Sequence, residues 1–336
     1  MPLFDSGSAD EAWRLAVSSF RNGEGVRKQS GRGGNTLELL HVTINIRESR
    51  QRWVISRTPA LSVAFAIVEV IGILNGRRDS AYLNFFNPRL PQFAGTKPEY
   101  YGAYGFRLRQ HFGFDQLECA CNALRTNPDG RQVVLQIWDA KSDFPSDHGA
   151  PVADDIPCNI CSLLKVRDGR LEWSQIMRSN DLFLGLPHNF VQFMTLQEVI
   201  AGWLGVIPGS YTHFSDSLHL YERDVTNAFT CVQSRITENS DSLALPKQQA
   251  DEIWIEMNRR VDVLVENDLT PKKYGEIAKF DDAPGAFGNL IAIVAADAAR
   301  RRKCSEGVNL AIACCRNQQL RQLWDRWEER KKTHGQ

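Results

Sequence analysis

The chain has 336 residues, of which 43% are hydrophobic and 24% are charged, with 40 basic and 40 acidic side chains. This length allows one large domain or two ordinary ones, and the composition is that of a water-soluble globular protein. The balance of charge argues against broad attraction to nucleic acid or to a membrane, although a local basic pocket for one phosphate is compatible with it.

The first residues predict no secretory signal. Residues 1–20 mix acidic and basic side chains with apolar ones and contain no continuous apolar segment. The longest apolar runs, 61–74 and 287–296, are too short to span a bilayer. We therefore expect a cytoplasmic protein without membrane contact.

The eight cysteines are expected to be thiols in such a reducing compartment. Cys158 and Cys161 have the C-x-x-C spacing that zinc sites and redox dithiols share. A four-ligand zinc site needs a second pair, and the other cysteines have the wrong spacing for one. We therefore predict no metal site.

The first quarter of the chain predicts an amphipathic helix over 10–21, a strand over 36–46 and a mostly buried helix over 59–74. Residues 22–35 are rich in Gly, Arg, Lys and Ser, which predicts a mobile loop. Such a loop suits either a surface connection or an anion site, because glycine lets backbone N–H groups approach a phosphate.

Glu69 stands inside the apolar helix. An unpaired carboxylate in such a place costs several kcal/mol (order of magnitude), so it must be partnered, protonated or functional. The alternative is that this face of the helix reaches solvent.

The middle of the chain alternates loops, helices and strands. We predict, in chain order, a loop over 84–104, a helix over 116–125, a turn over 127–130, a strand over 131–138, a polar loop over 139–155, a hairpin over 158–177, a helix over 189–204 and a strand over 210–219.

Strand signals disappear from residue 243 on, and helices are predicted over 250–266, 286–303 and 309–332. The sequence thus predicts a catalytic domain over 1–240 and a helical C-terminal extension over 241–336. The basic run 300–303 is interpreted as a solvated helix end rather than a nucleic-acid site.

One thiol, one arginine and one amide follow one another between residues 157 and 221. Cys158 offers a nucleophile, and nearby arginine charge lowers the pKa of a thiol. Arg178 could supply that charge while gripping a phosphate, because a guanidinium forks onto phosphate oxygens.

The other polar residues of this segment suit a pyrimidine nucleotide. Asn189 carries a donor and an acceptor that match the O4 and N3–H edge of uracil, although it could instead cap the following helix. His219 and Tyr221 lie two apart on a strand and point the same way, so they could hold a sugar hydroxyl. A buried strand histidine can also be purely structural.

The ordered set resembles thymidylate synthase over about residues 10–225. The matching segments are Val68 to Gly76 with Glu69, Tyr104-Gly105, Asn127 to Arg131, Pro157-Cys158, Arg178-Ser179 with Asp181, Gly185 to Pro187 with Asn189, and His219 to Tyr221. Arg32-Gly33-Gly34 is the nearest match to the family's phosphate loop.

The resemblance implies an α+β fold, with a thymidylate synthase-like mixed sheet and packed helices, in a homodimer whose sheets pack back to back. It implies that Cys158 is the nucleophile and that Glu69 and Tyr104 are catalytic, with Glu69 organising proton transfer at O4.

The resemblance also implies how the substrates are held. The phosphate would be bound by Arg178, Ser179 and Arg32, with Arg131 donated by the other subunit. Asn189, His219 and Tyr221 would hold base and sugar. Asp181 would contact the pterin of 5,10-methylenetetrahydrofolate, the one-carbon donor.

Several positions depart from the family pattern. Asn159 replaces a histidine, Gln132 replaces a second arginine, and Phe85-Phe86 stands where tryptophans stack on the folate. The apolar tail that closes over the cofactor has no counterpart. A site that excludes less water would let water, rather than hydride, react with the exocyclic methylene and give a hydroxymethyl product.

We therefore predict one-carbon transfer from methylenetetrahydrofolate to C5 of a pyrimidine nucleoside monophosphate, through a cysteine adduct at C6. Asn189 favours uracil over cytosine, while methyl or hydroxymethyl product and ribose or deoxyribose sugar stay open. The alternative is a nucleotide-binding protein that kept the pocket and lost turnover. An RNA-binding protein fits the neutral charge poorly.

Overall fold

The computed structural model describes residues 2–23, 25–31, 33–146, 148–231, 237–266 and 269–333. The chain divides into two compact units. The first comprises residues 1–61, 116–138 and 157–236, and the second comprises residues 62–115, 139–156 and 237–336. None of the described helices is both long and apolar enough to cross a membrane.

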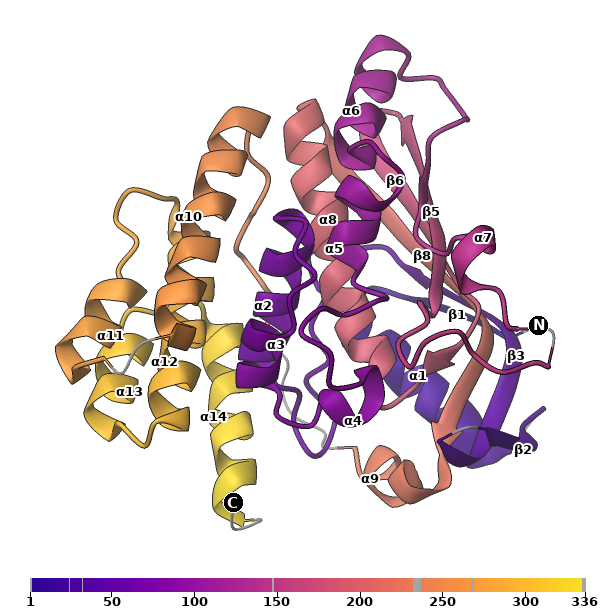
Figure 1. Cartoon of the computed structure of the whole chain (residues 1–336), viewed down its shortest axis with the longest axis horizontal. Helices are drawn as coiled ribbons and strands as arrows, with labels where there is room; N and C mark the ends of the chain where they lie inside the picture. The colour runs from indigo at the N-terminus through magenta and orange to yellow at the C-terminus, as the bar shows by residue number, and fades with distance from the viewer. Residues whose placement is uncertain are drawn as a thin grey trace. The chain divides into compact units, whose positions relative to one another are not determined.

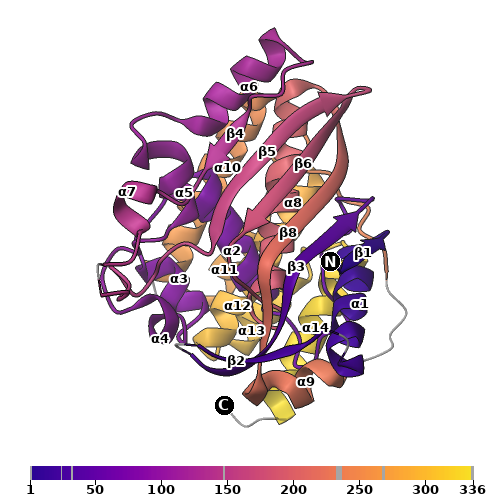
Figure 2. The ribbon, with the colours of Figure 1, turned by 90° about the vertical axis from the view of Figure 1, so that its right-hand side faces the viewer.

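The first unit is built on a mixed sheet with the strand order β1-β3-β8-β6-β5-β4 (Figure 2). Strand β2 pairs with β3, and β7 pairs with β8. The strands are β1 Leu3–Ser6, β2 Arg27–Gly31, β3 Gly34–Ile46, β4 Val134–Gln136, β5 Asn159–Arg167, β6 Arg170–Met177, β7 Asn180–Asp181 and β8 Ile207–Tyr221.

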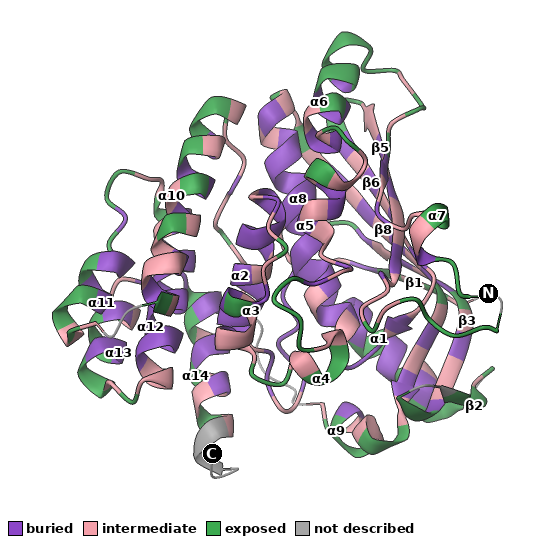
Figure 3. Ribbon diagram, in the orientation of Figure 1, coloured by how far each residue is buried: buried purple, intermediate pink, exposed green. Residues whose placement is uncertain are grey.

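Four α-helices accompany this sheet, together with the 3-10 turn Glu222–Asp224: α1 Ala9–Asn22, α6 Gln116–Thr126, α8 Gly185–Leu204 and α9 Val225–Phe229. Helix α8 is buried along most of its length and packs on β6 and β8 (Figure 3). It ends at Gly205, whose φ of 71° is a left-handed conformation that favours glycine. The predicted α+β mixed sheet with packed helices is therefore confirmed.

Two predictions for this unit have different outcomes. The hairpin over 158–177 is confirmed as β5 and β6, joined at Asp168-Gly169, where both residues have positive φ. The mobile loop over 22–35 is wrong, because residues 27–31 form β2 and pair with β3. The ladder to β3 fixes this segment, although its polar, glycine-rich composition is typical of a loop.

The second unit is helical (Figure 1). A π-helical turn, Arg107–His111, follows α5. The α-helices are α2 Val63–Leu74, α3 Ala81–Phe86, α4 Pro91–Ala94, α5 Tyr104–Phe106, α7 Ala140–Asp143, α10 Lys247–Glu266, α11 Pro271–Ala278, α12 Gly285–Arg301, α13 Ser305–Ile312 and α14 Gln318–Thr333.

The helix predicted over 309–332 is in fact two helices. Helix α13 ends at Ile312, and α14 begins where Asn317 Oδ1 accepts a hydrogen bond from the N–H of Leu320 at 2.9 Å. That contact is an N-cap, which starts a new helix. Helix α11 was not predicted. The domain boundary at residue 240 stays a prediction.

The basic run 300–303 is not simply a solvated helix end. Arg300 and Arg301 both pair with the buried carboxylate of Asp297. Arg302 donates to the carbonyl oxygens of Leu264 and Val265 at 2.6 and 2.8 Å. Arg302 therefore joins the end of α12 to the end of α10, whereas Arg300 and Arg301 pair with Asp297 within α12.

Candidate active site

Cys158 and Arg178 are joined through the backbone and one side chain. The N–H of Arg178 donates to the Cys158 carbonyl oxygen at 2.9 Å, and Arg178 Nε donates to the Pro157 carbonyl oxygen at 2.9 Å. Cys158 is a half-buried thiol at the start of β5. Arg178 Nε is thus anchored to the backbone of the residue that precedes the predicted nucleophile.

Asp181 lies at the entrance to helix α8. Its Oδ1 accepts hydrogen bonds from the N–H groups of Phe183 and Leu184, at 2.7 and 3.0 Å. These bonds fix the carboxylate and place its charge at the helix N-terminus, where negative charge is stabilised. Ser179, next to Asn180 of β7, is half-buried.

Asn189 belongs to the first part of α8 and is only 6% exposed. Its Nδ2 donates to Gln192 Oε1 at 3.2 Å, one turn further along the helix. Helix α8 begins at Gly185, so the alternative reading of Asn189 as a helix cap is wrong.

His219 and Tyr221 lie on β8 with their ring centroids 5.2 Å apart. His219 is opposite Glu38 of β3 on one side and Asp181 of β7 on the other. Burial lowers the pKa of His219, and the charges of Asp181 and Glu38 only partly oppose this effect. The imidazole is therefore mainly neutral at pH 7, with one donor and one acceptor nitrogen.

The turn between β2 and β3 rests on Tyr221. Arg223 Nη1 donates to the Gly33 carbonyl oxygen at 2.6 Å, and its guanidinium lies 4.0 Å from the centroid of the Tyr221 ring. A Cβ at Gly33 would lie 2.6 Å from the Tyr221 hydroxyl, so only glycine permits this approach. Arg32 itself lies outside the described residues.

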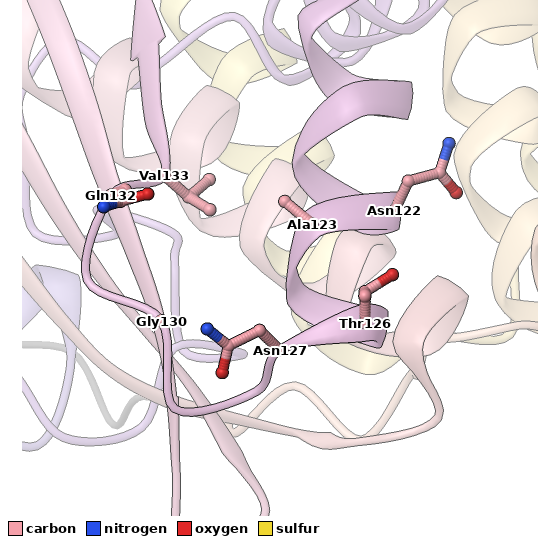
Figure 4. Close-up of a pocket in the computed structure, with 7 residues that line it drawn as sticks. All are labelled: Asn122, Ala123, Thr126, Asn127, Gly130, Gln132 and Val133. Carbon is pink, nitrogen blue, oxygen red and sulfur yellow. The ribbon is translucent and has the colours of Figure 1, made fainter.

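Arg131 is exposed in the loop that leads into β4. The loop and the end of α6 form a surface pocket of about 450 Å³ (Figure 4). None of its lining residues is a predicted site residue: they are Asn122, Ala123, Thr126, Asn127, Gly130, Gln132 and Val133. Arg131 itself does not line this pocket.

Glu69 and Tyr104 belong to the second unit. Glu69 is half-buried, whereas every other residue of α2 is buried. Burial raises the pKa of Tyr82, and the nearby Glu69 charge adds to this rise. Tyr104 opens α5, which packs closely on α2: a Cβ at Gly105 would lie 2.7 Å from the Gly72 carbonyl oxygen. The predicted acid and tyrosine therefore lie on two helices in contact.

Sequence reasoning missed a set of buried polar residues on the face of the sheet that α8 covers. Ser162, Gln175 and His213 are in register on three adjacent strands. We call the following residues, all at most 2% exposed, the inner polar row: Asn159, Ser162, Gln175, Asn180, His213 and Ser215.

His213 connects this row to the predicted site. Its Nε2 lies 2.7 Å from Asn180 Nδ2, and its Nδ1 lies 2.9 Å from the Tyr211 hydroxyl. Burial lowers the pKa of His213 to about 3, so the ring is neutral. Asn180 stands between Ser179 and Asp181, and its side-chain bond to His213 therefore helps to fix both.

The sequence did contain a signal for this row. Side chains alternate between the two faces of a strand, so a polar residue at an inward position of an apolar strand is informative. Gln175 lies two residues after the buried Trp173, and His213 two after the buried Tyr211. Asn159 escapes this rule, because a bulge between Asn159 and Cys161 shifts the alternation.

No group of three His, Cys, Asp or Glu side chains within the described ranges is arranged to hold a metal ion. Of the two cysteines whose spacing raised the question, Cys158 precedes β5 and Cys161 lies at its bulge, and burial raises the pKa of the Cys161 thiol. A raised thiol pKa disfavours the thiolate that zinc binding or disulfide exchange needs.

Comparison with known proteins gives a consistent family assignment. The family model described as "Thymidylate synthase" matches residues 18–275. The "Deoxyuridylate hydroxymethyltransferase" of Pseudomonas phage M6 is 35% identical over 201 residues, which are 59% of this chain and 56% of that protein. The protein of the same name from Bacillus phage SP01 is 33% identical over 204 residues, covering 57% and 52%.

A "Putative thymidylate synthase" of Methanothermobacter thermautotrophicus is also similar, with 29% identity over 217 residues that are 63% of this chain and 90% of that protein. The chain spans little more than half the length of the two phage relatives.

Proposed function

The chain belongs to the thymidylate synthase family, and on this premise we propose that it transfers a one-carbon unit from methylenetetrahydrofolate to C5 of a uracil nucleotide, with a hydroxymethylated base as product. Two of its relatives bear the name deoxyuridylate hydroxymethyltransferase, which supports this product and a deoxyribose sugar. The absence of the family's folate-stacking tryptophans at Phe85-Phe86 supports the same choice.

The observation that carries the proposal is the attachment of Arg178 to the backbone of Pro157 and Cys158. A thiolate that adds to C6 of uracil turns C5 into an enolate carbon, which can attack an electrophile. Arg178, anchored through Nε, favours the thiolate by its charge and draws the nucleotide phosphate towards the same place. Ser179, the next residue, adds a hydroxyl donor.

Base and sugar would be held by residues of α8 and β8. Asn189 is buried and carries the donor and the acceptor that a uracil edge requires. The neutral imidazole of His219 and the hydroxyl of Tyr221 lie on one side of β8 and would hold a sugar hydroxyl. Arg32, which lies outside the described residues, would add the phosphate contact that the resemblance implies.

The residues present fit the folate cosubstrate at one position that the structure describes well. The carboxylate of Asp181 is fixed through Oδ1 by two backbone N–H groups, and Oδ2 is left to accept from a pterin N–H. When bound, methylenetetrahydrofolate supplies the electrophilic carbon. The roles of Glu69 and Tyr104 in moving the proton at O4 and C5 are carried over from the resemblance.

A homodimer is part of the proposal. In Figure 2 the strands of the sheet face the viewer, with the helices of the same unit behind them. The side chains on this outer face are half-buried and largely apolar or hydroxylic, among them Leu163, Ser174, Ile176, Thr212 and Phe214. Such a face suits a second sheet, and the exposed Arg131 would reach the partner's phosphate.

The test is incubation with 5-fluoro-2′-deoxyuridylate and methylenetetrahydrofolate, followed by mass spectrometry of the peptide that contains Cys158. We expect a covalent adduct, and we expect hydroxymethyldeoxyuridylate when the natural nucleotide is supplied. Calorimetry that shows tight nucleotide binding with no adduct and no exchange at C5 would favour a binding protein without turnover. No adduct with any pyrimidine monophosphate would remove the enzymatic proposal.

A further inference from the structure

The amide of Gln175 has only one orientation that satisfies its neighbours. The indole Nε1–H of Trp173 is a donor only, and it lies 3.0 Å from Gln175 Oε1. The Ser162 hydroxyl also donates to this oxygen, at 2.8 Å. On the other side, Gln175 Nε2 donates to the carbonyl oxygen of Cys161 at 3.1 Å. A donor-only group and an acceptor-only group thus fix which end of the amide is oxygen.

The fixed amide of Gln175 in turn fixes Asn159. Gln175 Nε2 is 2.5 Å from the side chain of Asn159, and a donor there can only be met by Oδ1. The Nδ2 group of Asn159 must therefore point away from Gln175. Asn159 is 0% exposed, and within the part of the chain that the structure describes its Nδ2 has no hydrogen-bond partner.

A buried amide N–H without a partner is rare and calls for an explanation. Asn159 directly follows Cys158 in the chain, so the unsatisfied Nδ2 group belongs to the residue next to the predicted nucleophile. The group needs an acceptor oxygen small enough to enter a packed interior. Water meets both demands, because buried waters typically bind polar groups that would otherwise be unsatisfied.

We propose that Asn159 is the positioning residue for the water that reacts with the exocyclic methylene at C5, and hence that it determines the hydroxymethyl product. This inference rests on the proposed function. Nδ2–H donates to one lone pair of the water, and the other lone pair remains to attack. Gln175 keeps Asn159 in this orientation. Trp173 and Ser162, which orient Gln175, therefore influence the product only through Asn159.

The step balances without any redox partner. The water oxygen forms a bond to the methylene carbon, and the electron pair of the exocyclic double bond moves onto the C4–O4 enolate. One proton of the water is lost to solvent. The enolate then re-forms its carbonyl, restores the C5–C6 double bond and expels the Cys158 thiolate. Tetrahydrofolate leaves without being oxidised, in contrast to hydride transfer, which would yield dihydrofolate.

Asn159 Nδ2 could instead donate to O4 of the base. Donation to O4 and donation to water predict different effects on the reaction. A donor to O4 would stabilise the enolate and so accelerate thiolate addition. A donor to water acts only after the one-carbon unit has been transferred. Thiolate addition can be measured without folate, as exchange of the C5 hydrogen of deoxyuridylate in deuterated water, followed by NMR.

The test compares Asn159→Asp and Asn159→Ala with the native chain. Asp keeps the oxygen that meets Gln175 and replaces the donor, whereas Ala removes both. We expect C5 exchange and the fluorodeoxyuridylate adduct to be unchanged in both variants. We expect the rate of hydroxymethyl formation to fall about 100-fold, the cost of a misplaced reacting group. The methylene should instead be captured by an added thiol or reduced to methyl with formation of dihydrofolate.

The matched control is Gln197→Met, which removes another buried amide of the same unit, one bonded to the carbonyl oxygens of Leu171, Gly209 and Ser210. It should leave the product ratio unaltered even if stability falls. Loss of C5 exchange in Asn159→Asp would overturn the proposal in favour of O4 contact, and an unaltered product ratio in both Asn159 variants would overturn it outright. Absence of C5 exchange in the native chain would instead count against the proposed function.

Discussion

The backbone N–H of Arg178 donates to the carbonyl oxygen of Cys158 across 2.9 Å, so the first residue after β6 is tied to the residue that precedes β5. The side chain of Arg178 repeats this tie through Pro157. One backbone bond and one side-chain bond thus attach Arg178 to the segment that contains the predicted nucleophile. These bonds join the two ends of the hairpin formed by β5 and β6.

Replacing Arg178 by Lys keeps the charge and removes the Nε contact and the bidentate geometry. We expect the affinity for the nucleotide and the rate of adduct formation at Cys158 each to fall about 10- to 100-fold, as for the loss of one charge-assisted hydrogen bond. Stopped-flow fluorescence and mass spectrometry measure the two. The control is Arg170→Lys, an exposed position at the start of β6. Native adduct rates in Arg178→Lys would show that the anchored guanidinium is dispensable.

Glu198 and Arg52 form a buried ion pair in the first unit, and Arg52 Nη1 also donates to Thr195 Oγ1 at 2.7 Å. Glu198→Gln leaves the guanidinium buried without its countercharge. We expect a loss of about 3–5 kcal/mol in the free energy of unfolding, measured by urea denaturation. Breaking the exposed pair of Arg47 and Asp5 should cost at most about 1 kcal/mol. Equal losses of unfolding free energy for the two ion pairs would mean that burial does not determine how much an ion pair contributes.

Gly72 of α2 allows Tyr82 to approach the helix. A Cβ at Gly72 would lie 1.8 Å from the Tyr82 hydroxyl oxygen, which no small shift can relieve. We expect Gly72→Ala to destabilise the second unit by about 1–3 kcal/mol, as overpacking does. The double variant with Tyr82→Phe removes the clashing oxygen and should recover part of that loss. If thermal unfolding shows the two changes to be additive, the two residues are not in contact.

His213 should make the protein sensitive to acid. Its pKa is lowered to about 3 by burial, whereas the unfolded chain takes up the proton near pH 6.5. Stability is thus complete above pH 6.5 and falls as the pH is lowered from there towards 3, by at most about 1.4 kcal/mol per pH unit. His213→Gln should flatten this dependence, at the cost of lower stability at pH 7. Parallel pH profiles of unfolding in the two chains would contradict the assignment.

The C-terminal helices should be required for α2 to fold. Helices α10, α12 and α14 pack on α2, and Arg77, just beyond α2, donates to Asn258 and Asp262 at 2.8 and 2.6 Å. A chain that ends at residue 240 would expose the apolar side chains that surround Glu69. We expect such a fragment to aggregate or to lack cooperative unfolding. A monodisperse fragment with a sharp transition would instead support a self-contained catalytic domain over 1–240.

The elements that were predicted correctly are those set by short-range sequence patterns. The hairpin that carries Cys158 and Arg178, the end of α8 at Gly205 and the long strand that ends at Tyr221 all follow from local rules of turns, caps and alternation. Such rules depend on residues close together in the chain. The predictions for these elements accordingly needed only small changes in their bounds.

The features that were missed depend on partners far away in the chain. Strand β2 has the composition of a loop, and only its ladder to β3 makes it a strand. The orientation of Asn159 depends on Gln175, which in turn depends on Trp173. The basic run near Arg301 looks solvent-exposed in sequence, and Asp297 one turn earlier neutralises it. No local pattern contains these relationships.

The hydrogen bonds within the inner polar row also bear on how the protein could be re-engineered. Asn159 owes its orientation to Gln175, and Gln175 owes its own to Trp173 and Ser162, so changing these residues one at a time would leave a buried polar group unpaired at each step. Exchanging Ser162, Gln175 and Asn159 together for hydrocarbons of matching volume, with Trp173→Phe so that no buried indole N–H is left without an acceptor, avoids that barrier. We therefore expect the fold to tolerate simultaneous substitution of these residues better than single substitutions.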